Sequence, residues 1–100
     1  MMILHTVNKS PLTHSGFTDC LNSCAQGSSI ILIEDGVYAA VKQQETEHLL
    51  GLAPGVKLYA LEADIIARGL ADQLLETVTI TNDSGFVKLV TEHDTVVSWY

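Results

Sequence analysis

The sequence predicts an α/β domain of three layers: a mostly parallel, five-stranded sheet with helices on both faces. Two observations predict this fold. Residues 30–33 and 56–61 form apolar runs, which are typical of strands that are covered on both faces. Each run ends in acidic residues and continues into a helix-forming segment, an order that requires parallel pairing through right-handed crossovers. Ligands in such sheets bind beyond the carboxyl ends of the strands, so we expect a site there.

The expected elements follow from apolar runs and the residues that interrupt them. The strands are expected at 2–7, 30–33, 56–61, 78–80 and 96–100. The helices are expected at 15–25, 36–43, 63–69 and 84–92, with a further helix-compatible segment at 44–52 and a short turn or helical piece at 71–75. Pro11 follows the first strand, Gly27 ends the first helix, and Pro54 precedes the third strand, as residues that break regular structure do.

Length and composition predict one domain over residues 1–100 that is covered by other subunits. Apolar residues make up 47% of the chain, and charged residues 17% against a usual ~25%. A small domain has much surface to cover, and monomers rarely expose large apolar patches. We therefore expect an oligomer.

The charge of the chain argues against nucleic-acid binding. Twelve acidic and five basic residues give a net charge of −7, whereas nucleic-acid affinity comes mostly from basic groups that neutralise phosphates. Docking on an anionic membrane is excluded for the same reason. No apolar stretch approaches the ~20 residues that span a bilayer, and no basic segment of a signal peptide begins the sequence. We expect a cytoplasmic protein with reduced cysteines.

Cys20 is the candidate catalytic residue, since an activated thiolate can act as a nucleophile or carry sulfur. The alternative is a core position, because Phe17, Cys20, Leu21 and Cys24 recur at the spacing of a buried helix stripe. If the helix began late, with Thr18 as its cap, the helix dipole would favour a thiolate at Cys20. Cys24, deeper in the helix, is expected to be inert. A disulfide between the two is not expected, because residues four apart hold their Cβ atoms ~5–6 Å apart and a disulfide needs ~3.8 Å.

Four acidic residues, Glu34, Asp35, Glu62 and Asp64, lie at the expected carboxyl edge of the sheet. They suggest a divalent-cation or phosphorylation site, and thus a small enzyme. The favoured alternative is electrostatic, because acids near helix N-termini stabilise the helix. A phosphorylated receiver domain would also need acids after the first strand, where the sequence has Lys9 instead.

The four histidines are scattered, at His5, His14, His48 and His93. None has the spacing of a zinc site with a second histidine or cysteine. His5 is expected in the core with a hydrogen bond, and His14 in a solvated loop or as a base beside the cysteine helix. Glycines are too sparse for a phosphate-binding loop. We expect no cofactor and no metal.

Several blocks of the sequence together resemble the DsrH/TusB family of sulfur relay subunits. They are ILHTVNKSP at 3–11, LIEDGVYAA at 32–40, LYALEAD at 58–64, ARGL at 67–70 and GFVKL at 85–89, with His93 and Trp99. The resemblance covers nearly the whole chain. It implies an α/β fold shared by three related small subunits, which assemble as a heterohexamer with two copies of each.

The resemblance also implies two alternative roles. A TusB-like chain would join TusC- and TusD-like subunits, which pass persulfide sulfur to a downstream carrier for 2-thiolation of the tRNA wobble uridine. A DsrH-like chain would join DsrE- and DsrF-like subunits in dissimilatory sulfur oxidation. The sulfur passes between proteins, which fits an acidic chain that does not touch RNA itself.

Cys20 matches a cysteine found in DsrH-type members and absent from many TusB-type members. The resemblance places the better-established sulfur carrier in the TusD or DsrE subunit, so two interpretations stay open for this chain. Either Cys20 carries a persulfide by thiol exchange, with Lys9 or His14 favouring the anion, or the subunit is a non-catalytic scaffold with a buried, inert cysteine. Whether the chain is an enzyme depends on which of these two interpretations is correct.

Overall fold

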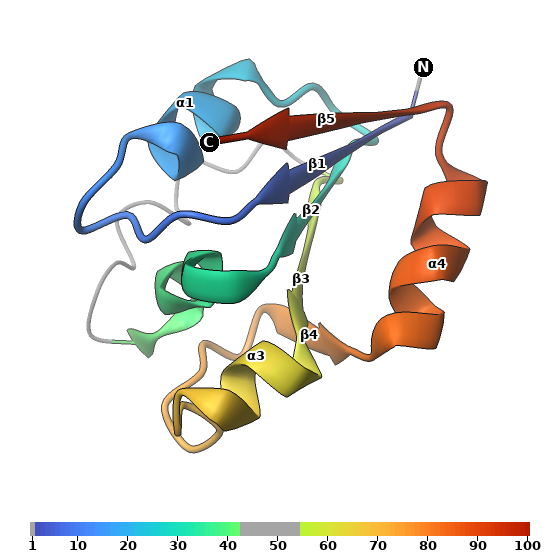
Figure 1. Ribbon diagram of the computed structural model, residues 1–100. Helices are drawn as coiled ribbons and strands as arrows, with labels where there is room; N and C mark the ends of the chain where they lie inside the picture. The colour runs from blue at the N-terminus through green and yellow to red at the C-terminus, as the bar shows by residue number, and fades with distance from the viewer. Residues whose placement is uncertain (1, 43–54) are drawn as a thin grey trace.

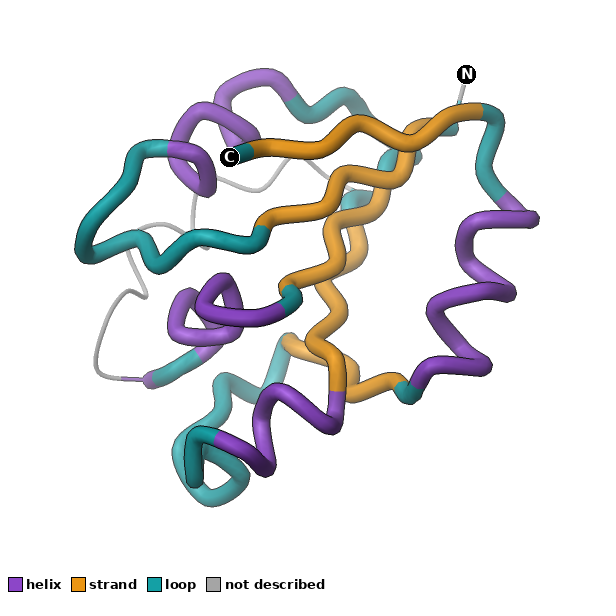
Figure 2. Tube along the Cα trace, viewed as in Figure 1, coloured by secondary structure: helices purple, strands orange, loops and turns teal. Residues whose placement is uncertain are grey.

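The computed structural model describes residues 2–42 and 55–100 and confirms the predicted fold class (Figures 1 and 2). Every strand pair in the five-stranded sheet is parallel, and the strand order is β4-β3-β2-β1-β5. The elements in chain order are β1 (Ile3–Val7), α1 (Gly16–Ser23), β2 (Ser29–Leu32), η1 (Glu34–Ala40), β3 (Lys57–Leu61), α3 (Glu62–Ala67), β4 (Val78–Thr81), α4 (Asp83–Glu92) and β5 (Thr95–Trp99).

The strand order determines which helices share a face of the sheet. From β1 to β4 the chain always steps toward the same edge, so right-handed crossovers put α1, η1 and α3 on one face. The connection from β4 returns past β1 to reach β5, which puts α4 on the opposite face. Figure 1 shows α4 alone on its side of the sheet. One face is therefore thickly covered and the other thinly.

The core follows this asymmetry. The larger cluster of buried apolar side chains lies under α1, η1 and α3 and includes Val7, Phe17 and Ile30. The smaller cluster, Leu4, Ile31 and Leu89, lies under α4. Neighbouring residues on a strand thus enter opposite clusters, and for this reason the strands are apolar throughout rather than alternating.

Several large apolar side chains stay exposed on α4 and on the two edge strands of the sheet. They are Val87 and Val90 on α4, Val96 and Val97 on β5, and Ile80 on β4. Burial of such side chains is worth about 1.5–3 kcal/mol each, so their exposure fits the apolar surplus of the sequence. The oligomer expected from composition stays a prediction. Among the described residues, the helices are all too short or too polar to cross a bilayer.

The segment after β2 differs most from the sequence-based expectation. It begins at Glu34 rather than Gly36 and is a 3-10 helix rather than an α-helix. The chain turns directly off the strand, which places Glu34 at a φ of 49°. Gly36 then lies against the end of β1, where a Cβ atom would overlap the carbonyl oxygen of Val7. The helix-compatible segment 44–52 lies outside the described residues.

Replacing Gly36 by alanine tests this close approach. Because the Val7 carbonyl belongs to an interior strand and accepts a hydrogen bond from the Ile33 N–H at 3.0 Å, we expect Gly36→Ala to lower the free energy of unfolding by about 1–3 kcal/mol. Gly16→Ala is the matched control, since a Cβ there meets Tyr100 at 3.4 Å or more. Urea denaturation of both variants should show a loss only at Gly36; equal stabilities would contradict the packing described.

Candidate functional site

The two cysteines lie at the C-terminal half of α1, in different surroundings. Cys20 points into the core and is 0% exposed, whereas Cys24 is half-buried. The helix ends at Ser23, so Cys24 is the first residue past it, with an extended backbone (φ −67°, ψ 129°) and an N–H that donates to the Cys20 carbonyl at 2.9 Å. Both thiols are free, and their sulfurs are 3.9 Å apart.

Helix α1 begins after Ser15, not after Thr18, so Cys20 is not in a first turn that would favour its thiolate. Its side chain joins the main core cluster, as the stripe spacing indicates. The hydrogen bond with Cys24 and burial raise the pKa of the Cys20 thiol. The same hydrogen bond lowers the pKa of Cys24, against the effect of burial. The geometry therefore makes Cys24, expected to be inert, the more accessible and more acidic thiol.

His5 lies on β1 and faces the same layer as the cysteines. Its ring is 4% exposed, and burial lowers the pKa of the imidazole, so the ring is neutral. The indole Nε1–H of Trp99, on the neighbouring strand β5, donates to His5 Nδ1 at 3.0 Å. A neutral ring that accepts at Nδ1 carries its proton on Nε2. That Nε2 is buried and has no hydrogen-bond partner among the described residues.

These side chains form one group. A ring nitrogen of His5 and the sulfurs of Cys20 and Cys24 all lie within 4.8 Å of one another. The fold brings them together because α1 packs on β1, and β5 pairs with β1 in a register that sets His5 beside Val97. Sequence spacing gave no sign of this group, since fifteen residues separate His5 from Cys20. The available signal was that His5 and Val7 share a strand face, which α1 covers.

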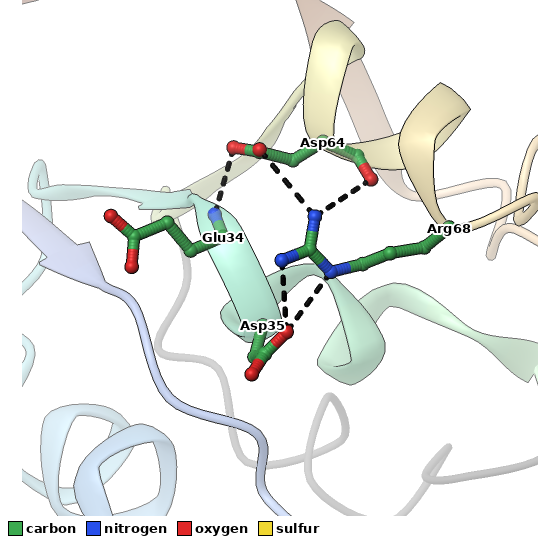
Figure 3. A network of polar contacts seen from close by, with 4 residues as sticks. All are labelled: Glu34, Asp35, Asp64 and Arg68. Atoms are coloured by element: carbon green, nitrogen blue, oxygen red, sulfur yellow. Dashed lines mark hydrogen bonds and ion pairs between the residues drawn. The ribbon is translucent and has the colours of Figure 1, made fainter.

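Two of the four acidic residues at the carboxyl edge, Asp35 and Asp64, form ion pairs with Arg68 of the chain itself (Figure 3). The Arg68 guanidinium donates to one oxygen of Asp35 from Nη2 at 2.9 Å and from Nε at 3.0 Å. It also contacts Asp64, whose second carboxylate oxygen accepts the backbone N–H of Glu34 at 2.8 Å. These contacts hold the start of η1 against α3. They support the interpretation that these acidic residues stabilise the fold and do not form a ligand site. Glu62 is exposed at the start of α3.

The other candidates from the sequence lie elsewhere. His14 is exposed and shares a hydrogen bond with Thr13. Within the described residues, neither His14 nor Lys9 forms a hydrogen bond or ion pair with a cysteine. His93 contacts the Leu89 carbonyl and the Ser29 hydroxyl, which joins the end of α4 to β2. His48 lies outside the described residues.

Comparison with known proteins shows the family to which the chain belongs. The family model described as DsrH like protein matches residues 9–96. The chain belongs to the DsrH-like family. Protein TusB of Enterobacter sp. (strain 638) is 38% identical over 97 residues, which are 97% of this chain and 100% of that protein. Protein TusB of Escherichia coli (strain K12) is 35% identical over the same shares. The resemblance noted in the sequence is thus confirmed.

Two solved structures share the fold of this DsrH-like chain. The ychN protein from E. coli superimposes with a TM-score of 0.83 at 16% identity and covers 98% of both chains. MTH1491 from Methanobacterium thermoautotrophicum, described as a protein of unknown function, gives a TM-score of 0.71 at 18% identity over 97% of this chain and 96% of that one. At such identities the likeness shows the fold alone.

The exposure of the thiols predicts their order of reaction. In the native, reduced protein we expect one thiol to react quickly with a maleimide or a disulfide reagent, and the second only after denaturation. Cys24→Ser should remove the fast phase, whereas Cys20→Ser should keep it. A fast phase that survives Cys24→Ser would contradict the burial of Cys20.

The buried, neutral His5 predicts a pH dependence of stability. Its native pKa is lower than the ordinary value of 6.5, so the unfolded chain takes up the proton first as the pH falls. The contribution of the neutral His5 ring to the free energy of unfolding is complete above pH 6.5 and is lost progressively as the pH falls below 6.5. Between about pH 7.5 and pH 5.5, His5→Gln should therefore lose less unfolding free energy than the parent chain. His14→Gln, at an exposed ring, should behave like the parent; equal slopes for all three would refute a buried neutral His5.

Proposed function

We propose that this DsrH-like chain is a subunit of a persulfide sulfur relay, acting with related small subunits and a downstream sulfur carrier protein. The family match over residues 9–96 carries the proposal. The relatives at 35–38% identity bear the name TusB, which favours delivery of sulfur for 2-thiolation of the tRNA wobble uridine over the DsrH-like role in sulfur oxidation. The net charge of −7 suits a protein that hands sulfur to other proteins rather than one that binds tRNA.

Cys20 is the proposed persulfide carrier of this chain, and Cys24 provides its route to the surface. A Cys24 thiolate attacks the outer sulfur of a donor persulfide, which forms a Cys24 persulfide and releases the donor thiolate. The Cys20 sulfur, 3.9 Å from the Cys24 sulfur, then attacks that outer sulfur, and its proton passes to the Cys24 sulfur that is released. The same step in reverse returns the sulfur to Cys24 for an acceptor. No oxidant or reductant is consumed, because the outer sulfur of the persulfide only passes from one cysteine sulfur to another.

A scaffold without sulfur chemistry is the second candidate function. The complete burial of Cys20 favours it, because a donor protein cannot reach that sulfur without movement of α1. In this alternative the exposed apolar side chains on α4 and β5, Val87, Val90 and Val96 among them, are the contribution of the chain, as contacts for the TusC/TusD- or DsrE/DsrF-like subunits.

A native pull-down of the tagged chain from its own cells tests the relay. Intact-mass spectrometry should find two related small subunits with it, because the proposal places the chain in a complex. Recovery of the chain alone, with no related subunit under gentle conditions, would overturn the relay proposal.

Sulfur loading separates the carrier from the scaffold. The purified chain, kept in a chelator, is treated with a persulfide donor, and its mass is measured. A carrier should gain the mass of one sulfur atom, lose it on addition of a thiol, and fail to hold it in Cys20→Ser. Loading that persists in Cys20→Ser and vanishes in Cys24→Ser would make Cys24 the carrier. Sulfur found only on a partner subunit would make this chain the scaffold.

A further inference from the structure

We propose that His5, Cys20 and Cys24 form a binding site for one thiophilic d10 metal ion, Zn²⁺ or Cu⁺. One imidazole nitrogen and two thiolates are a ligand set that these ions prefer, and that Mg²⁺ and Ca²⁺ do not. The inference rests on the positions of the side chains and does not require the relay function.

The spacing of the sulfurs matches that of metal-bound thiolates. A Zn–S bond is about 2.3 Å, so two thiolates on one tetrahedral ion lie about 3.8 Å apart. The two sulfurs here are 3.9 Å apart without an ion. One His5 nitrogen lies within 4.8 Å of both sulfurs, whereas a nitrogen and a sulfur on one tetrahedral ion lie about 3.5 Å apart, so an ion between the three atoms needs a contraction of up to about 1.3 Å on that side. The backbone of α1 and β1 already holds the three ligands on one side of the sheet.

The unpaired nitrogen of His5 is an independent indication of a ligand. Buried polar atoms almost always have a partner, yet Nε2 of this 4% exposed ring has none within residues 2–42 and 55–100. Nδ1 is engaged by Trp99, so Nε2 is the nitrogen that is free to bind. A metal ion held jointly with the two sulfurs would satisfy it.

Binding at Nε2 has a defined consequence for Trp99. The ring proton must move from Nε2 to Nδ1, which then donates and no longer accepts a hydrogen bond. The Trp99 indole N–H must turn away from His5, while the two thiols release their protons. Trp99 is the one tryptophan of the chain, so its fluorescence reports occupation of the site directly.

The site has a route for the ion and an open coordination position. Cys20 and His5 are buried, but Cys24 is half-exposed just past the end of α1. An ion can therefore meet the Cys24 sulfur first and then the other two ligands. Three protein ligands leave one position of a tetrahedral Zn²⁺ for water or another ligand.

Titration of the full, reduced chain with Co²⁺ under anaerobic conditions tests the proposal. Co²⁺ takes Zn²⁺ sites, and its thiolate bonds give charge-transfer absorption in the near ultraviolet. We expect this absorption to saturate at one ion per chain, with a parallel change in tryptophan fluorescence, and to disappear when Zn²⁺ is added. Displacement by Cu⁺ supplied from a weak chelator, at a lower free concentration than Zn²⁺, would identify Cu⁺ as the preferred ion.

Cys24→Ser is the decisive variant, because its half-exposed position leaves the core intact. It should weaken Co²⁺ binding by about 100-fold or more, since it removes a ligand that touches the ion. His14→Gln is the matched control and should bind like the parent chain. Co²⁺ binding without thiolate absorption, binding that Cys24→Ser leaves unchanged, or saturation with no response of Trp99 would each overturn the proposal. The titration uses no sulfur donor, and the sulfur-loading assay uses a chelator, so the two proposals fail separately.

Discussion

The hydrogen bond from Trp99 to His5 is the interaction that sets the tautomer of the imidazole in the candidate site. It joins the last strand of the chain to the interior strand β1, across 94 residues of sequence. Because Nδ1 accepts this bond, the proton of the neutral ring is placed on Nε2, and the opposite edge of the ring stays free. With α1 packed over β1, the ring lies in the layer that holds Cys20 and Cys24, and one of its nitrogens lies within 4.8 Å of both sulfurs. Without the bond, either ring nitrogen could carry the proton.

The same strand order that pairs β5 with β1 explains the unequal faces of the sheet. Among the described residues, α1, η1 and α3 cover the face that holds the cysteines, and α4 covers the other. The thick face therefore has a closed core in which a thiol and an imidazole are shielded from water. The thin face and its edges leave apolar side chains such as Val87 exposed. A relay subunit needs both a thiol that is shielded from water and surfaces that bind the neighbouring subunits.

Most of the fold could be predicted from the sequence, because apolar runs, glycines and prolines report strands and turns locally. All five strands and four of the expected helical elements are present within two residues of their expected starts. The 3-10 form of η1 could not be predicted, since it depends on contact between Gly36 and the distant Val7 carbonyl. The site could be predicted only in part. Cys20 could be identified from its chemistry. The exposure of Cys24 could not, because α1 ends at Ser23, two residues before its expected end. No local pattern links Trp99 to His5.

Trp99 holds His5 as a buried, neutral ring with its proton on Nε2. Long-range ¹H–¹⁵N NMR of the imidazole measures this directly, because the two ring nitrogens have different shifts in each tautomer. We expect the Nε2–H tautomer at neutral pH, a ring pKa below the ordinary value of 6.5, and slow exchange of the Trp99 indole proton. A ring protonated on Nδ1, or an indole proton that exchanges as in a free peptide, would contradict it.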